Sequence, residues 1–104
     1  MKTGDYTHQG FIAPGYMIEQ LNNYIKTGQD LGHFLTAVIE NNLMRATARA
    51  DGHNILNIPA YCAYLYNEAP SACHGSPEKV KAWQKQRREY HAAKANEVDS
   101  NANH

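Results

Sequence analysis

Apolar residues recur at helical spacing in the first part of the chain. Ile18, Leu21 and Ile25 lie three to four residues apart, which places them on one face of a helix. Gly28 follows this stripe, and glycine readily adopts the left-handed conformation that closes a helix. The pattern predicts a helix over residues 14–27.

A longer apolar stripe follows Asp30, whose carboxylate can accept hydrogen bonds from the free amides at the start of a helix. The stripe consists of Leu31, Phe34, Leu35, Val38 and Ile39. It predicts a second helix from Asp30 to about Arg49. Asn41 and Asn42 interrupt the apolar face with amide groups, and this interruption is the first candidate for a specific role.

A third apolar stripe ends before Pro70 and contains Pro59. Its members are Ile55, Ile58, Cys62 and Leu65. If this helix begins near Asp51, Pro59 lies inside it and kinks it; if it begins at Pro59, residues 51–58 form a turn or a short helical segment. We prefer the start near Asp51. Residues 68–75 then form a loop.

The strongest local signal marks the start of a fourth helix. Ser76, Pro77 and Glu78 combine a capping hydroxyl, a proline suited to the first helical position and an acidic group in the first turn. Trp83 can pack inward, whereas residues 84–94 are mostly polar. We expect that half to project from the core or to pack on another copy.

These elements predict an all-α fold, a compact bundle of about four helices in one domain. Residues 1–13 lack sustained periodicity, so we expect a flexible N-terminal arm that is ordered only if it docks on something. Residues 14–83 form the helical core domain. Residues 84–104 form a polar helical extension and tail, which is expected to fray over residues 96–104.

Charge and composition narrow the function classes. Ten Lys and Arg balance ten Asp and Glu, which disfavours nonspecific nucleic-acid binding. Cys62 and Cys73 do not form the framework of a small secreted domain and suit the reduced thiols of a cytosol. No run approaches the roughly 20 apolar residues that cross a bilayer, and the first residues lack a signal segment. We expect a cytoplasmic protein with no membrane partner.

Catalytic and metal motifs are not recognisable in the sequence. Cys73 and His74 are a single adjacent pair without a second ligand pair at zinc spacing. The alternative is that Cys62 is a small core residue and His74 a loop residue. No nucleophile motif, glycine-rich phosphate loop or paired carboxylates accompany them. The sequence therefore favours a protein that is not an enzyme and needs no cofactor.

One polar cluster is a candidate ligand-binding surface. Arg45 and Arg49 lie four residues apart, with Asn41 and Asn42 one turn earlier. Guanidinium and amide groups on adjacent turns can hold a phosphate, a base edge or a partner carboxylate. The alternative is a buried polar network that joins the second and third helices through Asp51, Asn54 and Asn67.

Tyrosines crowd the third helix. Tyr61, Tyr64 and Tyr66 cannot all face one small core, so at least one is expected to be exposed or buried between subunits. Tyrosine suits both interfaces and base stacking because it has an apolar face and a polar tip. We therefore add Tyr64 to the candidate ligand site and expect a homo-oligomer.

Several motifs between Pro14 and Trp83 resemble a family of small uncharacterised proteins encoded by phages and prophages. They are Leu-x-x-Tyr-Ile at 21–25, Gly-x-Phe-Leu-Thr-Ala-Val-Ile-x-Asn-Asn-Leu at 32–43, Arg-Ala-Asp at 49–51, Leu-Tyr-Asn-Glu-Ala-Pro-Ser-x-Cys at 65–73 and Gly-Ser-Pro-Glu-Lys-Val-Lys-Ala-Trp at 75–83. The segment from Pro14 to Trp83 that contains them covers about two thirds of the chain. The resemblance implies a viral context and carries no catalytic residue, because the family has no established activity.

A small phage protein of this kind is expected to act by occupying a molecule of the host, in the host cytoplasm. In one hypothesis, it interferes with host defence by sequestering a nucleotide second messenger, with tyrosines stacking on bases and the Arg and Asn groups holding phosphates. In the alternative, it directly blocks a host protein through exposed tyrosines and the fourth helix. A small enzyme or a structural accessory protein is the second alternative.

Overall fold

The computed structural model describes the backbone of residues 4–102 and the side chains of residues 4–95. The elements are β1 (Tyr6–His8), β2 (Phe11–Ala13), α1 (Gly15–Thr27), α2 (His33–Ile39), α3 (Leu43–Arg49), α4 (Gly52–Glu68), the 3₁₀ turn η1 (Ser71–Cys73) and α5 (Pro77–Ala102). The predominance of helix is confirmed. Two details of the predicted four-helix, all-α bundle are wrong, because the described residues contain a small sheet and five α-helices.

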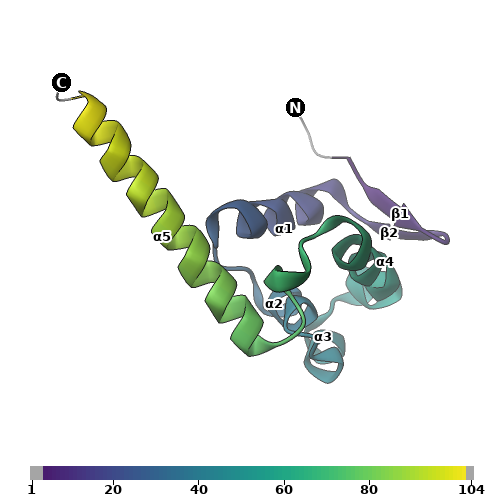
Figure 1. Ribbon diagram of the computed structural model, residues 1–104. Helices are drawn as coiled ribbons and strands as arrows, with labels where there is room; N and C mark the ends of the chain where they lie inside the picture. The colour runs from purple at the N-terminus through teal and green to yellow at the C-terminus, as the bar shows by residue number, and fades with distance from the viewer. Residues whose placement is uncertain (1–3, 103–104) are drawn as a thin grey trace.

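The small sheet lies within the predicted arm. β1 and β2 pair antiparallel, with Tyr6 opposite Ala13, and the turn between them has positive φ at Gln9 and Gly10. Two such residues give a turn whose twist matches that of the flanking strands. The hairpin packs on α4 (Figure 1), where the Ile12 amide donates to Asn57 Oδ1 at 2.8 Å. The arm is therefore ordered by docking from residue 4 onward.

The predicted second helix is two helices. Asn41 adopts φ 62°, a left-handed conformation that asparagine tolerates, and this residue separates α2 from α3. Asn42 then caps α3, because its Oδ1 accepts a hydrogen bond from the Arg45 amide at 3.0 Å. The predicted cap Asp30 is also wrong: α2 starts after Gly32, and Asp30 pairs with Arg88 at 3.0 Å.

The third predicted helix has the preferred start. Asp51 caps α4 by accepting from the Asn54 amide at 2.7 Å, and Pro59 lies inside the helix. The alternative start at Pro59 is wrong. α1 also has its predicted end, because Gly28 takes φ 75° and donates its amide to the Tyr24 carbonyl at 2.8 Å.

The core lies between α1, α2, α4 and η1. The largest fully buried side chains are Leu21, Tyr24, Leu35, Ile39, Tyr61 and Cys73. Both buried tyrosines have hydrogen-bond partners: Tyr24 donates to the Cys73 carbonyl, and Tyr61 donates to Asn54 Oδ1, each at 2.7 Å. Buried hydroxyls thus meet the requirement that desolvated polar groups be paired.

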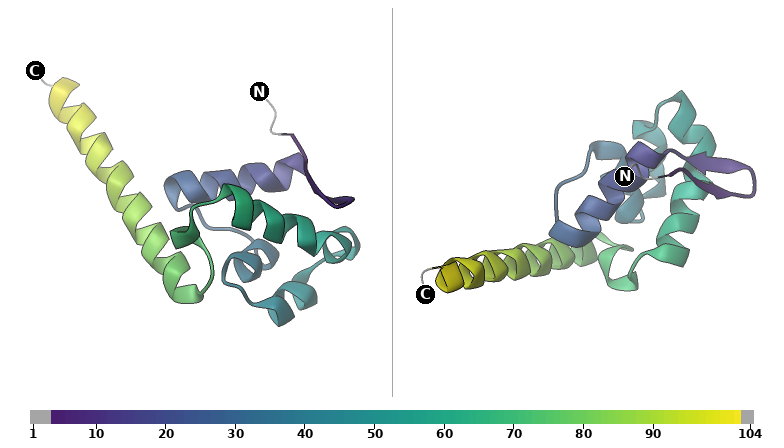
Figure 2. Two further views of the ribbon diagram at one scale, coloured as in Figure 1. Left: turned by 45° about the vertical axis from the view of Figure 1, so that its right-hand side comes forward. Right: turned by 90° about the horizontal axis from the view of Figure 1, so that it is seen from above.

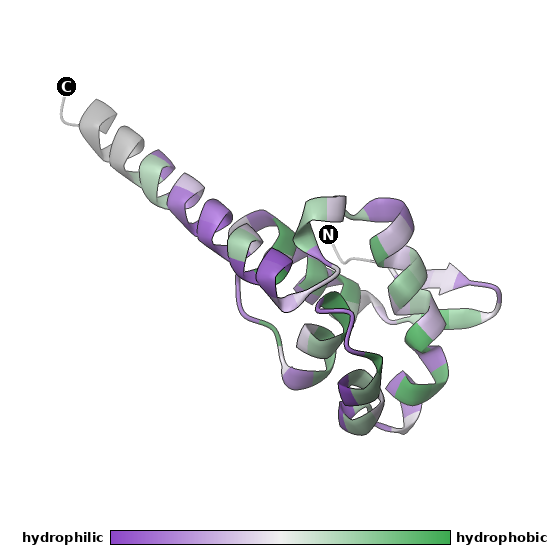
Figure 3. Ribbon diagram, turned by 60° about the horizontal axis from the view of Figure 1, so that its bottom comes forward, coloured by the Kyte–Doolittle hydropathy of each residue, from purple (hydrophilic) through white to green (hydrophobic). Residues whose placement is uncertain are grey.

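α5 crosses the end of α1 and then leaves the globule, as both views in Figure 2 show. Its predicted cap is confirmed, since Ser76 Oγ accepts from the Lys79 amide at 3.1 Å. Figure 3 shows that the coloured part of α5 is largely hydrophilic. No helix in the described part of the chain is long and apolar enough to cross a membrane. The backbone of α5 is helical to Ala102, residues 103–104 lie outside the described ones, and the fraying expected for residues 96–104 stays a prediction.

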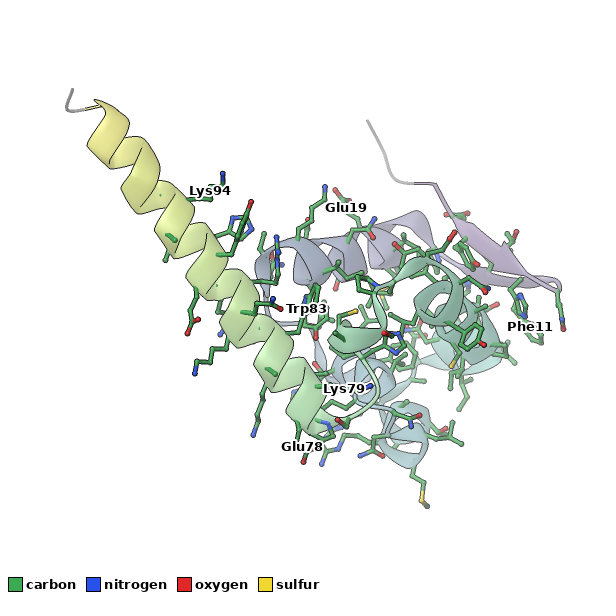
Figure 4. All side chains as sticks on the ribbon, in the orientation of Figure 1. Phe11, Glu19, Glu78, Lys79, Trp83 and Lys94 are labelled. Carbon is green, nitrogen blue, oxygen red and sulfur yellow. The ribbon has the colours of Figure 1, made fainter. Side chains whose placement is uncertain are left out.

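The joint between α1 and α5 is built on carbonyl groups at the end of α1. Figure 4 shows Trp83 pointing from α5 towards the globule, and its Nε1 donates to the Ile25 carbonyl at 3.0 Å. Arg88 donates to the Gly28 carbonyl at 2.8 Å, and Arg87 donates to the Lys26 carbonyl at 2.9 Å. Cationic donors suit the negative end of a helix dipole.

We expect Gly28→Ala to destabilise the protein more than Gly10→Ala. Both positions have positive φ, which costs about 1–2 kcal/mol for alanine. A Cβ at Gly28 would also lie 2.9 Å from the Gln84 carbonyl oxygen, whereas Gly10 faces open space. The added clash is expected to raise the loss to about 2–4 kcal/mol. Urea denaturation measures the difference; equal losses would mean that the joint is loose.

We expect the free energy of unfolding to fall as pH rises above about 9. Burial raises the pKa of Cys73 to about 11 and of Tyr61 to about 12, and it also raises the pKa of Tyr24. In the unfolded chain these groups lose protons near their ordinary values of 9.0 and 10.0, so alkali favours unfolding. The slope is about 1.4 kcal/mol per pH unit for each such group. Urea midpoints that stay constant up to about pH 10.5 would contradict this expectation.

Candidate partner-binding surface

The structure brings four of the five predicted site residues together on the α2–α3 corner. Asn41 and Asn42 form the junction between the helices, and Arg45 and Arg49 follow on α3. Both arginine side chains are exposed. Among the described side chains, neither guanidinium donates a hydrogen bond or forms an ion pair.

The described side chains do not form the predicted polar network between the second and third helices. Asp51 caps α4, Asn54 accepts from Tyr61, and Asn67 Nδ2 lies 3.4 Å from the Tyr6 hydroxyl. Asp51, Asn54 and Tyr61 are linked within α4 and its cap, whereas Asn67 contacts β1, and none of these hydrogen bonds includes Arg45 or Arg49. The two guanidinium groups are therefore available to a partner molecule.

Tyr64 lies apart from this corner. Its hydroxyl donates to Asn22 Oδ1 on α1, and its ring meets the edge of Tyr6 with the centroids 5.2 Å apart. Cys62, which lines a hollow beside α2 and α3, is two residues away and therefore about 200° around the helix. The predicted ligand site is thus divided: four residues lie on the α2–α3 corner, and Tyr64 lies on the side of α4 that faces away from this corner.

The other tyrosines of α4 confirm that the three cannot share one core. Tyr61 is fully buried, whereas Tyr66 is 86% exposed. Periodicity shows that their directions differ, but it does not show which face meets the core. Only the positions of α1 and the hairpin decide that Tyr64 is an internal contact.

The exposed part of α3 carries both apolar and cationic groups. Ala46 is the buried residue of this helix, and Leu43 and Met44 are 66% and 84% exposed. We call Met44, Arg45, Ala48 and Arg49, which lie on one side of α3, the α3 surface. Sequence reasoning missed the exposure of Leu43 and Met44, because in one continuous helix Leu43 would lie at the edge of the apolar stripe, four residues after Ile39, and the search for a site followed polar groups. The asparagine pair was the signal that the helix breaks before them.

Shallow hollows surround the outer side of α4. We call Ile55, Pro59, Cys62 and Tyr66 the outer face of α4. One hollow lies between this face and the α2–α3 corner, and its lining is Ala37, Val38, Asn41, Asn42, Leu43, Ala46, Ile58 and Cys62. Another lies towards the hairpin and includes His8, Pro59, Cys62, Ala63, Tyr66 and Asn67. The lining is mainly apolar, with a few amide and imidazole groups.

The pKa values of two titratable groups near these hollows are shifted. Desolvation by the surrounding groups raises the pKa of the Cys62 thiol, although this residue is exposed and is not the core residue that the sequence suggested. Burial, followed by the charge of Lys79, lowers the pKa of His74, which lines a third hollow with Cys62. A thiolate nucleophile requires a lowered thiol pKa, so this environment suits binding rather than thiol catalysis.

The described residues contain no group of three or more His, Cys, Asp and Glu side chains that could hold a metal ion. Comparison with known proteins found no family model, no curated protein and no solved structure that matches this chain. The resemblance to phage proteins therefore stays a hypothesis that rests on the sequence motifs.

We expect alanine at Arg45 or Arg49 to change the free energy of unfolding by less than about 0.5 kcal/mol, because both side chains are exposed.

Tyr64→Phe is expected to lower the free energy of unfolding by about 1 kcal/mol, since it removes the hydrogen bond to Asn22. Tyr66→Phe is the matched control and is expected to be neutral. Urea denaturation measures all four variants. A large loss in Arg49→Ala would restore the network alternative.

Proposed function

We propose that this chain is a small non-enzymatic binding protein that acts by occupying another protein through the α3 surface. The observation that carries the proposal is the composition of that surface. Two arginines without a partner among the described side chains stand beside Met44, which is 84% exposed. Methionine and arginine are enriched in the centres of protein interfaces.

The chemistry of the α3 surface indicates the kind of partner it would accept. Arg45 and Arg49 can each make two parallel hydrogen bonds to a carboxylate. Met44 is a flexible apolar group that fills an irregular pocket. A protein surface with acidic groups around an apolar depression therefore fits best.

Nucleotide sequestration has less support. A nucleotide site needs an aromatic platform for the base close to cationic groups for the phosphates. Tyr64, the aromatic group expected for this role, makes its contacts with α1 and β1 instead. The hollow at the α2–α3 corner has a mainly apolar lining and does not include Arg45 or Arg49, which favours a protein side chain over a charged phosphate there.

The resemblance of the sequence motifs to phage proteins suggests where such a partner would be found. We propose that the chain blocks a protein of a bacterial host, and that a defence component is the class to examine first. Blocking needs only that the α3 surface cover a functional region of the partner. No catalytic group of this chain takes part in that action.

We expect a host protein to bind the immobilised wild-type chain and to be lost with Met44→Asp and with Arg45→Glu. Each substitution places a negative charge opposite the expected acidic partner, so affinity is expected to fall at least tenfold, about 1.4 kcal/mol. Lys85→Glu changes an exposed cation on α5 and is the matched control. Capture from host lysate, followed by titration of the purified partner, measures the effect. Equal retention of the partner by all variants would contradict the proposal that it binds the α3 surface.

A thermal-shift screen with linear and cyclic nucleotides tests the competing hypothesis on the same samples. Since a ligand that binds only the folded state stabilises it, sequestration requires a melting temperature that rises by several degrees with one nucleotide class. We expect no such rise. A rise that Arg45→Glu abolishes would return the function to nucleotide binding.

A further inference from the structure

α4 is apolar on two opposite sides. Its inner side places Ala60, Tyr61 and Leu65 in the core, yet its outer face also consists of apolar or weakly polar groups. Ile55 is 43% exposed and Tyr66 is 86% exposed. A helix on the surface of a globular protein normally carries polar residues on its outer side. The outer face of α4 is therefore uncovered in the single chain.

This face also lacks charge. Gly52–Asn67 contains no Asp, Glu, Lys or Arg, so the nearest charged side chains on α4 and its cap are Asp51 and Glu68, at its two ends. A partner that relied on ion pairs would find nothing to pair with here. In a two-fold symmetric pair each surface group meets the same surface, so an uncharged face avoids repulsion between like charges.

The spacing of the outer face is the same when it is read in either direction. Ile55, Pro59, Cys62 and Tyr66 are separated by four, three and four positions. In an antiparallel pair of α4 helices, Ile55 of one copy would therefore lie opposite Tyr66 of the other, and Pro59 opposite Cys62. Every member of the stripe finds a partner in one register.

The shape of the surface fits the same arrangement. Hollows lie along the stripe: Cys62 lines one of them together with Ile58, and Pro59, Cys62 and Tyr66 line the other together with Ala63. Two helices pack when the ridge of one enters the groove of the other. We propose that the outer face of α4 packs antiparallel on the same face of a second copy of this chain.

The area indicates how tightly the two copies would hold. α4 has 17 residues and is about 25 Å long at about 1.5 Å per residue. A strip of that length and about two helix diameters wide covers on the order of 500 Å² per copy. This is less than the roughly 800 Å² of a standard interface, so we expect a dimer that dissociates in the micromolar range. The proposal does not rest on the function of the α3 surface.

Cys62 supplies a direct test, because it is exposed at the centre of the stripe and Cys73 is fully buried. We expect light scattering to show a mass that rises from one chain to two across the micromolar range, and a short bis-maleimide to join two copies through Cys62. Cys62→Ser is expected to prevent the covalent link and to retain the dimer mass.

Tyr66→Asp and Ile55→Asp are each expected to raise the dissociation constant of the dimer at least tenfold, because a carboxylate would be buried in the apolar contact. Both side chains are exposed in the single chain, so folding should survive; circular dichroism checks this. Tyr90→Asp on α5 is the matched control. Met44→Asp should also keep the dimer, which separates this test from that of the α3 surface. A one-chain mass at every concentration, or a dimer that persists in both α4 variants, would overturn the proposal.

Discussion

The packing of other elements onto α4 is the constraint on which the rest of the structure depends. α2 and α3 have seven residues each, and isolated helices of fewer than about 12 residues are marginal in water. The three-residue strands of the hairpin are equally weak alone. Asn57 and Tyr64 on α4 hold the hairpin. The buried aromatic pair Phe34 and Tyr61 joins α2 to the same helix.

The uneven use of α4 explains why the molecule has two distinct candidate surfaces. The hairpin packs on one side of α4, where Tyr64 also bonds to Asn22 of α1, and α2 contacts α4 through Phe34 and Tyr61. The uncovered part is the outer face of α4, which is uncharged and has the same spacing in either direction. The neighbouring α3 surface carries two arginines and an exposed methionine, which suit a different and acidic molecule. The two surfaces consist of different residues, so a substitution on one is expected to leave binding at the other unchanged.

Helix boundaries that depend on local chemistry were predictable from the sequence. Gly28, Asp51 and Ser76 act within one turn of their own positions, so their identities suffice to place the end of α1 and the starts of α4 and α5. The asparagine pair marked the break between α2 and α3. The sequence analysis instead predicted one continuous helix and interpreted the pair as a candidate site. Asp30 was misassigned because its partner, Arg88, is 58 residues away.

The sequence by itself determined that this chain is mainly helical and that its tyrosines on α4 point in different directions, since both follow from residue types and the period of the helix. Only the tertiary structure decided that Tyr64 is an internal contact and Tyr66 is exposed, and that Leu43 and Met44 face solvent. The reason is that a face of a helix becomes inner or outer only when other elements pack against it. Those contacts join residues far apart in the chain, and no local pattern specifies them.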